Sequence, residues 1–132
     1  MNIETKCNNV SGIIDTGERK IYETGASREP KVGRFDLISP IALTRLAIWY
    51  EKGGQKYEDR NWEKGIPIVG CINAIFRHLL KWLMRWDGED HMAAIAWNAF
   101  VIMDFEITKP NQIKEYVTNL RNINTNIFEG GN

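Results

Sequence analysis

Two largely apolar stretches of the sequence, residues 67–86 and 89–107, carry polar side chains at spacings that group them on helix faces. Residues three, four or seven apart lie on one side of an α-helix. His78 therefore aligns with Trp82, and His91 with Asn98. Arginine, lysine and histidine neutralise phosphates, and tryptophan stacks on bases. If the two helices are antiparallel neighbours, the pattern predicts one nucleotide-binding cleft lined by Arg77, His78, Trp82, His91, Trp97 and Asn98.

A charged loop over residues 55–66 adds further groups of the same chemistry. One interpretation is a solvated loop that Tyr57 and Trp62 anchor, and the other is a loop over the cleft that handles phosphate or metal. Arg34, which lies upstream, is a further candidate phosphate contact. The nucleotide-binding candidates in the loop are Lys56, Tyr57, Arg60, Asn61 and Trp62.

Four acidic residues lie near the expected helix ends. Carboxylates at such positions can converge on a divalent cation, which activates water for hydrolysis. They can also simply cap helices, because the positive end of the helix dipole favours acids. The candidate catalytic and metal-binding residues are Asp59, Asp87, Glu89 and Asp90.

Four helices are expected to position these residues. Ser39 and Pro40 form a capping and starting signal, and Gly53–Gly54 is expected to end that first helix. Pro67 is expected to open a second helix to about residue 86. A third helix runs from about residue 89 to 107, and a fourth follows Pro110 to about residue 120. Short connections favour antiparallel neighbours, so the fold class is an all-α, antiparallel four-helix bundle.

The domain organisation follows from these elements. Residues 1–39 have no helical period and are predicted to be extended, with a short β-hairpin that pairs residues 12–15 with residues 19–23 across Thr16–Gly17. Residues 40–122 form the helical nucleotide-binding domain, and residues 123–132 form a loose tail. The second and third helices are apolar on more than one face, which indicates burial on most sides. This predicts a homodimer or higher homo-oligomer that completes the core.

The composition excludes several classes of protein. The 132 residues include 17 Lys+Arg and 17 Asp+Glu, a balance that gives no support for a nucleic-acid or membrane binder. No apolar run approaches the roughly 18 residues that span a bilayer. Cys7 and Cys71 are expected to be free thiols in a cytoplasmic protein, and they lack the Cys/His spacing of a zinc site. The glycine-rich phosphate loops and the GxSxG elbow are also absent from the sequence.

Five segments in order, over about residues 25–106, resemble the phage dATP/dGTP diphosphohydrolase N-terminal domain family. They are Gly33–Pro40, Lys56–Gly65, Arg77–Leu79, Gly88–Met92 and Ala96–Asn98. The resemblance implies a relationship to MazG-like, all-α nucleoside triphosphate pyrophosphohydrolases, which are helical dimers or tetramers. It also implies Mg²⁺ held by acidic residues, water attack on the α-phosphate, and a nucleoside monophosphate and pyrophosphate as products.

One departure from the MazG-like pattern keeps two functions open. That pattern has ExxE on one core helix and ExxD on the next, whereas this chain has no acid between Pro67 and Asp87. The first hypothesis is a Mg²⁺-dependent purine deoxynucleoside triphosphate pyrophosphohydrolase, in the host cytoplasm if a phage encodes it. The alternative is a non-catalytic phage counter-defence protein that sequesters a nucleotide-derived immune signal, of the cyclic dinucleotide or cyclic ADP-ribose type. A structural helical dimer without a ligand is the third possibility.

Overall fold

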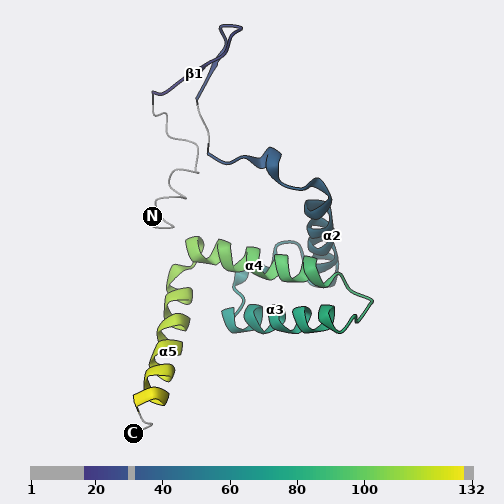
Figure 1. Cartoon of the computed structure of the whole chain (residues 1–132), viewed down its shortest axis with the longest axis vertical. Helices are drawn as coiled ribbons and strands as arrows, with labels where there is room; N and C mark the ends of the chain where they lie inside the picture. Colours follow the sequence, from purple (N-terminus) through teal and green to yellow (C-terminus); the bar gives the residue numbers. More distant parts are fainter. Residues whose placement is uncertain (1–16, 30–31, 130–132) are drawn as a thin grey trace. The chain divides into compact units, whose positions relative to one another are not determined.

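The computed structural model describes residues 17–29 and 32–129, with residues 122–129 described by their backbone alone (Figure 1). The chain divides into two units, Met1–Ile38 and Ser39–Asn132. Cys7 and the first arm of the predicted hairpin, residues 12–15, lie outside the described residues.

The first unit contains the short antiparallel hairpin that the sequence predicts, but with different strands. β1 (Lys20–Ile21) pairs with β2 (Ser27–Arg28), and Ile21 faces Ser27 in the register. Gly25 has a φ of +85°, a left-handed conformation that glycine adopts without steric cost, and its N–H donates to the Tyr22 carbonyl. Because this turn follows residues 20–21, they pair with Ser27–Arg28, which come later in the sequence. A 3₁₀ helix, η1 (Phe35–Leu37), follows.

The second unit is helical, as predicted. Ser39 caps the first helix by accepting a hydrogen bond from the Ala42 N–H at 3.2 Å, and Pro40 is its first residue. The Asp90 carboxylate caps the third helix by accepting from the Ala93 N–H at 3.1 Å. The elements are α2 (Pro40–Lys56), the 3₁₀ helix η2 (Asn61–Lys64), α3 (Ile68–Leu83), α4 (His91–Thr108) and α5 (Pro110–Glu129).

Two helices continue beyond their predicted ends. α2 passes through Gly53–Gly54 to Lys56. A Cβ atom at Gly54 would lie 2.6 Å from Oδ1 of Asp59, so this glycine permits a close approach rather than a helix end. α5 reaches Glu129, and the sequence retains a helical apolar spacing past Leu120, at residues 123 and 127.

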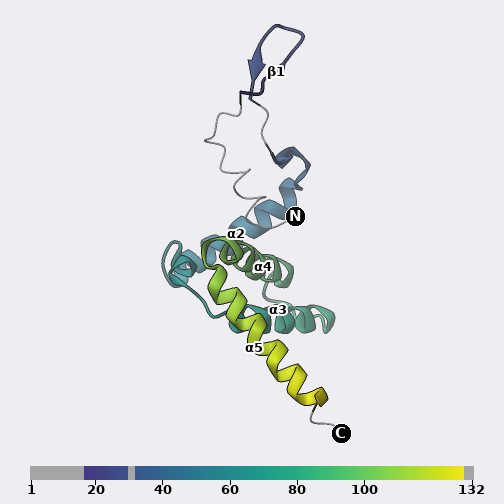
Figure 2. The ribbon, with the colours of Figure 1, turned by 90° about the vertical axis from the view of Figure 1, so that its left-hand side faces the viewer.

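α4 is the central element of the helical unit. It packs most extensively against α3, and it also contacts α2 and α5 (Figures 1 and 2). The buried cluster of the unit comes from α3 and α4, and its members are Ile68, Cys71, Val101 and Phe105. Trp62, Ile66 and Trp97 pack against this cluster from its edge. The loop that contains Trp62 is therefore held against the α3–α4 pair.

α3 also presents an apolar face that is exposed in the single chain. Val69, Phe76, Leu80 and Leu83 recur at helical spacing, and each is exposed, Phe76 by 62%. In the part of the chain that the structure describes, no helix combines the length and the apolarity that crossing a membrane requires.

Candidate functional site

A cavity of about 930 Å³ opens between α2, the loop after it, α3 and α4. Its volume lies in the range of ligand pockets, roughly 300–1,000 Å³. Lys52, Lys56 and Arg60 contribute positive charge to its lining. Aromatic side chains line the same cavity, namely Trp49, Tyr50, Tyr57, Trp62 and Trp97. The larger cavity therefore combines cationic groups with flat aromatic surfaces.

The loop on one side of the larger cavity contains two ion pairs of its own. Arg60 has a positive φ of 57°, an uncommon conformation for a residue with a Cβ atom. Its guanidinium pairs with Glu63, and Lys64 pairs with Glu58. The Arg60 contact also lowers the pKa of the Glu63 carboxyl. Arg60 therefore lines the cavity with its guanidinium paired to Glu63.

A smaller cavity of about 880 Å³ lies at the turn between α3 and α4. Arg45, Trp82 and Asp90 are among its lining residues. The Arg45 guanidinium donates two hydrogen bonds to the Asp90 carboxylate, at 2.8 and 2.6 Å, and these lower the pKa of Asp90 to about 2. Gly88 and Glu89 line both cavities. The α3–α4 turn therefore forms part of each cavity wall.

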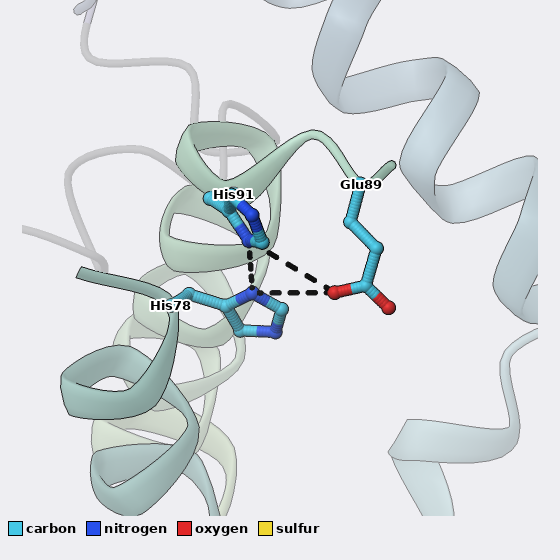
Figure 3. Close-up of side chains that lie close together, drawn as sticks. All are labelled: His78, Glu89 and His91. Atoms are coloured by element: carbon cyan, nitrogen blue, oxygen red, sulfur yellow. Dashed lines mark hydrogen bonds and ion pairs between the residues drawn. The ribbon is translucent and has the colours of Figure 1, made fainter. Parts of the chain in front are cut away.

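Three potential metal ligands converge beside this turn (Figure 3). Nδ1 of His78 lies 3.0 Å from Nδ1 of His91. Oε2 of Glu89 lies 3.8 Å from Nδ1 of His78 and 3.9 Å from Nδ1 of His91. Among the described residues, these three form the one group of three or more such side chains whose ligand atoms converge, within 4.8 Å of one another. We call this group the His–Glu–His centre.

Neighbouring groups hold both imidazoles in place. Nε2 of His91 contacts the backbone carbonyl of Trp86 at 2.5 Å, and His91 is only 6% exposed. The Trp49 ring meets the His78 ring edge-on, with 5.8 Å between centroids. Burial is the main cause that lowers the pKa of His78, with a contribution from neighbouring positive groups, while Glu89 opposes the shift. Lowering this pKa favours a neutral imidazole near pH 7.

The structure distributes the sequence-predicted residues over these features. The larger cavity receives nine of the candidates from the sequence, and the smaller cavity receives five, with Glu89 common to both. In the larger cavity are Lys56, Tyr57, Asp59, Arg60, Asn61, Trp62, Glu89, Trp97 and Asn98, and in the smaller are Trp82, Asp87, Glu89, Asp90 and His91.

The remaining candidates lie elsewhere. His78 lines neither cavity but meets His91 at the centre. Arg77 is exposed on α3 and belongs to the lining of neither of these two cavities. Arg34 is in the first unit, where its guanidinium pairs with Asp36. Within the described residues the four candidate acids do not converge, since Glu89 alone among them belongs to the centre.

The residues at the site that sequence reasoning missed include three on one face of α2. Arg45 pairs with Asp90, Trp49 contacts His78, and Lys52 lines the larger cavity. With Lys56 they recur every three or four residues, so they share one helix face. That recurrence of cationic and aromatic residues was the available signal.

This arrangement can bind a ligand that has both a flat and an anionic part. Stacking on the tryptophan and tyrosine rings would hold a base, and the lysines with Arg60 would neutralise phosphates. The imidazole and carboxylate donors of the centre suit a divalent cation. The Asp90 carboxylate, by contrast, is occupied by Arg45 and by the start of α4.

Comparisons with known proteins agree with this chemistry. A family model described as dATP/dGTP diphosphohydrolase, N-terminal, matches residues 22–115. A search of curated proteins and a search of solved structures each gave no significant match. The matched range begins just after β1 and includes β2, α2, α3 and α4, and so contains both cavities and the His–Glu–His centre.

Proposed function

Because the chain belongs to the dATP/dGTP diphosphohydrolase, N-terminal, family, a family of nucleotide-hydrolase type, we propose that it hydrolyses purine deoxynucleoside triphosphates in the cytoplasm. The proposed products are the deoxynucleoside monophosphate and pyrophosphate. The observation that carries this proposal is the larger cavity, whose lining joins Lys52, Lys56 and Arg60 to aromatic rings at the edge of a His–Glu–His centre.

The proposed substrate pose follows from the lining of the larger cavity. The base stacks on the aromatic rings at Trp62 and Trp97, and the Asn98 amide is the candidate to read a base edge. The triphosphate lies toward Lys56 and Arg60, where each charge-assisted hydrogen bond contributes about 1.5–3 kcal/mol. The pose therefore requires the Arg60–Glu63 ion pair to be shared with the phosphate.

The proposed reaction is a displacement at the α-phosphorus. A water oxygen forms a bond to this phosphorus and loses a proton to the solvent. The bond from the phosphorus to the bridging oxygen of the β-phosphate breaks, and pyrophosphate leaves with the electron pair. A divalent cation, Mg²⁺ in the simplest case, would stabilise the developing charge and lower the pKa of the attacking water. Among the candidate acids, Glu89 both lines the larger cavity and lies close to the ring nitrogens of His78 and His91.

The decisive experiment combines product analysis with isotope labelling. Purified protein is incubated with each of the four deoxynucleoside triphosphates and Mg²⁺ or Mn²⁺ in ¹⁸O-water. We expect pyrophosphate from dATP and dGTP, with the label in the monophosphate. Label in pyrophosphate, or release of inorganic phosphate alone, would contradict attack at the α-phosphorus. Absence of turnover with every nucleotide would discard the enzyme.

Variants in the larger cavity test the phosphate contacts. Lys56→Gln and Arg60→Gln are each expected to raise KM by roughly ten-fold or more, since each removes a charge-assisted contact. Lys114→Gln, an exposed change on α5, is the matched control. Unchanged kinetics in both cavity variants would place the triphosphate elsewhere.

The non-catalytic alternative has one observation in its favour. α3 carries no Asp or Glu, and the four candidate acids do not converge within the described residues. A protein that sequesters a cyclic dinucleotide or a cyclic ADP-ribose relative needs the aromatic and cationic lining but no hydrolytic centre. Heat denaturation of protein preincubated with such a ligand distinguishes the two. Unbound ligand is removed before heating, so intact ligand released from the denatured protein supports sequestration, and hydrolysed ligand refutes it.

We also propose that the protein is a homo-oligomer, in the simplest case a homodimer. The support is the exposed apolar face of α3 at Val69, Phe76, Leu80 and Leu83. A contiguous apolar face on a small domain commonly marks an interface. A second copy would bury this face and complete the core.

A further inference from the structure

We propose that the His–Glu–His centre binds one divalent transition-metal ion, of the class that accepts imidazole nitrogen together with carboxylate oxygen, such as Mn²⁺, Co²⁺ or Zn²⁺. Mg²⁺ prefers oxygen ligands and retains several waters, so two imidazoles and one carboxylate suit it poorly. Binding of the ion stands on the geometry of the centre, whereas any use of the ion in hydrolysis rests on the proposed function.

The tautomer of His91 prepares one ligand atom. The Trp86 carbonyl oxygen can only accept a hydrogen bond, so Nε2 of His91 must donate to it. In the neutral ring this leaves the lone pair on Nδ1, which faces His78 at 3.0 Å. A ring nitrogen that donates to a backbone carbonyl while the other nitrogen is free is the arrangement that orients metal-bound histidines.

The separation of the two nitrogens suits a shared ion. Two nitrogens at about 2.1 Å from one metal lie roughly 3.0 Å apart on adjacent octahedral positions and roughly 3.4 Å apart in a tetrahedron. The observed 3.0 Å matches the octahedral case. The Glu89 oxygen, at 3.8 and 3.9 Å, must approach further, and its side chain is 51% exposed.

Without an ion, the same contact is an ordinary hydrogen bond in which Nδ1–H of His78 donates to Nδ1 of His91. Both nitrogens cannot be ligands in that state. Ion binding therefore requires the His78 proton to move from Nδ1 to Nε2, with no net proton release. This change of tautomer is a specific signature of the proposed site.

The ion would lie at the edge of the larger cavity. Glu89 lines that cavity, and so does Trp49, whose ring packs against His78. Nζ of Lys81 lies 3.9 Å from Oε2 of Glu89 and places a positive charge beside the same edge. The centre is thus adjacent to the space assigned to the nucleotide, and an anion in that space could approach the ion and Lys81 together.

Nitrogen NMR of the histidine rings tests the proposal directly. The chain contains two histidines, and both belong to the centre, so a tag-free protein labelled with ¹⁵N-histidine gives only these two sets of ring signals. We expect one equivalent of Zn²⁺ to shift both Nδ1 signals and to convert His78 to its Nε2–H tautomer. Unshifted ring signals at saturating Zn²⁺, or a tautomer that does not change, would overturn the site.

Equilibrium dialysis measures the affinity and the choice of ion. We expect one Mn²⁺ or Zn²⁺ per chain, undisturbed by a ten-fold excess of Mg²⁺. Glu89→Gln should weaken binding roughly ten-fold or more, and His78→Asn should weaken it further, with Glu115→Gln on α5 as the matched control. Because the Glu89 side chain is half exposed, we expect Glu89→Gln to fold normally. This variant therefore still tests the site if His78→Asn misfolds. Wild-type affinity in Glu89→Gln, or full displacement by Mg²⁺, contradicts the proposal.

These outcomes separate the ion site from the enzyme. Binding of Zn²⁺ with the tautomer change, but without turnover of any nucleotide, would refute the proposed function and leave the ion site standing. Turnover in the presence of Mg²⁺, together with histidine ring signals that Zn²⁺ does not shift, would support the proposed function and refute the ion site.

Discussion

Asp90 accepts three hydrogen bonds at the start of α4, two from the Arg45 guanidinium and one from the Ala93 N–H. These contacts favour the charged carboxylate, which is why its pKa falls from 3.8 to about 2. A carboxylate used in this way ties α2 to α4 and sets the position of the neighbouring Glu89 and His91. At the scale of the residue, Asp90 therefore stabilises the site by positioning its neighbours.

The lowered pKa of Asp90 predicts an acid-sensitive stability. A depressed folded-state pKa contributes stability that is complete above the unfolded value of 3.8 and is lost as the pH falls toward 2. We expect Asp90→Asn to reduce the free energy of unfolding by about 1–2 kcal/mol near pH 6, because Arg45 is half exposed and its pair is partly screened. Denaturant titrations at several pH values measure this. The variant should lose less stability than the wild type between pH ~4 and ~2, and equal losses would contradict the assignment.

Adjacent glycines of α2 give a matched pair of predictions. Gly53→Ala meets nothing within 4 Å and should stabilise the helix by about 0.5–1 kcal/mol. Gly54→Ala places its Cβ atom 2.6 Å from Oδ1 of Asp59, so it should displace that side chain and lose this gain. Thermal unfolding of both variants provides the comparison. An equal rise of Tm in the two would show that Asp59 moves away without cost.

At the scale of the element, the α3–α4 pair supports both cavities through a small buried cluster. Phe105→Ala removes a fully buried ring from that cluster, so we expect the free energy of unfolding to fall by about 3–5 kcal/mol. Thr118→Ala on the exposed side of α5 should change it by less than about 0.5 kcal/mol. Chemical denaturation followed by circular dichroism measures both. A loss below about 1 kcal/mol for Phe105→Ala would mean that the cluster does not hold the helices together.

Local signals in the sequence were sufficient to predict the helices but not the contacts between them. Ser39–Pro40 and Pro67 mark helix starts within one residue of those observed, and the third helix begins at His91, two residues after its predicted start, because capping depends on neighbouring residues. The facing of His78 and His91 was also predictable, since both lie on adjacent antiparallel helices. The Arg45–Asp90 pair joins residues 45 positions apart, and the Gly54–Asp59 approach depends on a loop conformation. Such contacts leave no periodic signal in a single sequence.

At the scale of the whole molecule, the exposed face of α3 predicts self-association. Light scattering after size exclusion should give a mass of at least twice the 15.2 kDa of one chain. Leu80→Glu, which places a charge in the centre of the face, should shift the protein toward the monomer, whereas Lys114→Glu on α5 should not. A monomeric wild type at high protein concentration would contradict the dimer and leave the α3 face without a partner.

The five tryptophans of the chain are divided between the two cavities, Trp49, Trp62 and Trp97 in the larger one and Trp82 and Trp86 in the smaller. Every intrinsic fluorophore of this type therefore borders a space that a ligand could enter. Emission from the unlabelled protein should respond to occupancy of either cavity, and replacing Trp82 and Trp86 with phenylalanine would leave a signal from the larger cavity alone. The molecule thus contains its own optical reporter for each site.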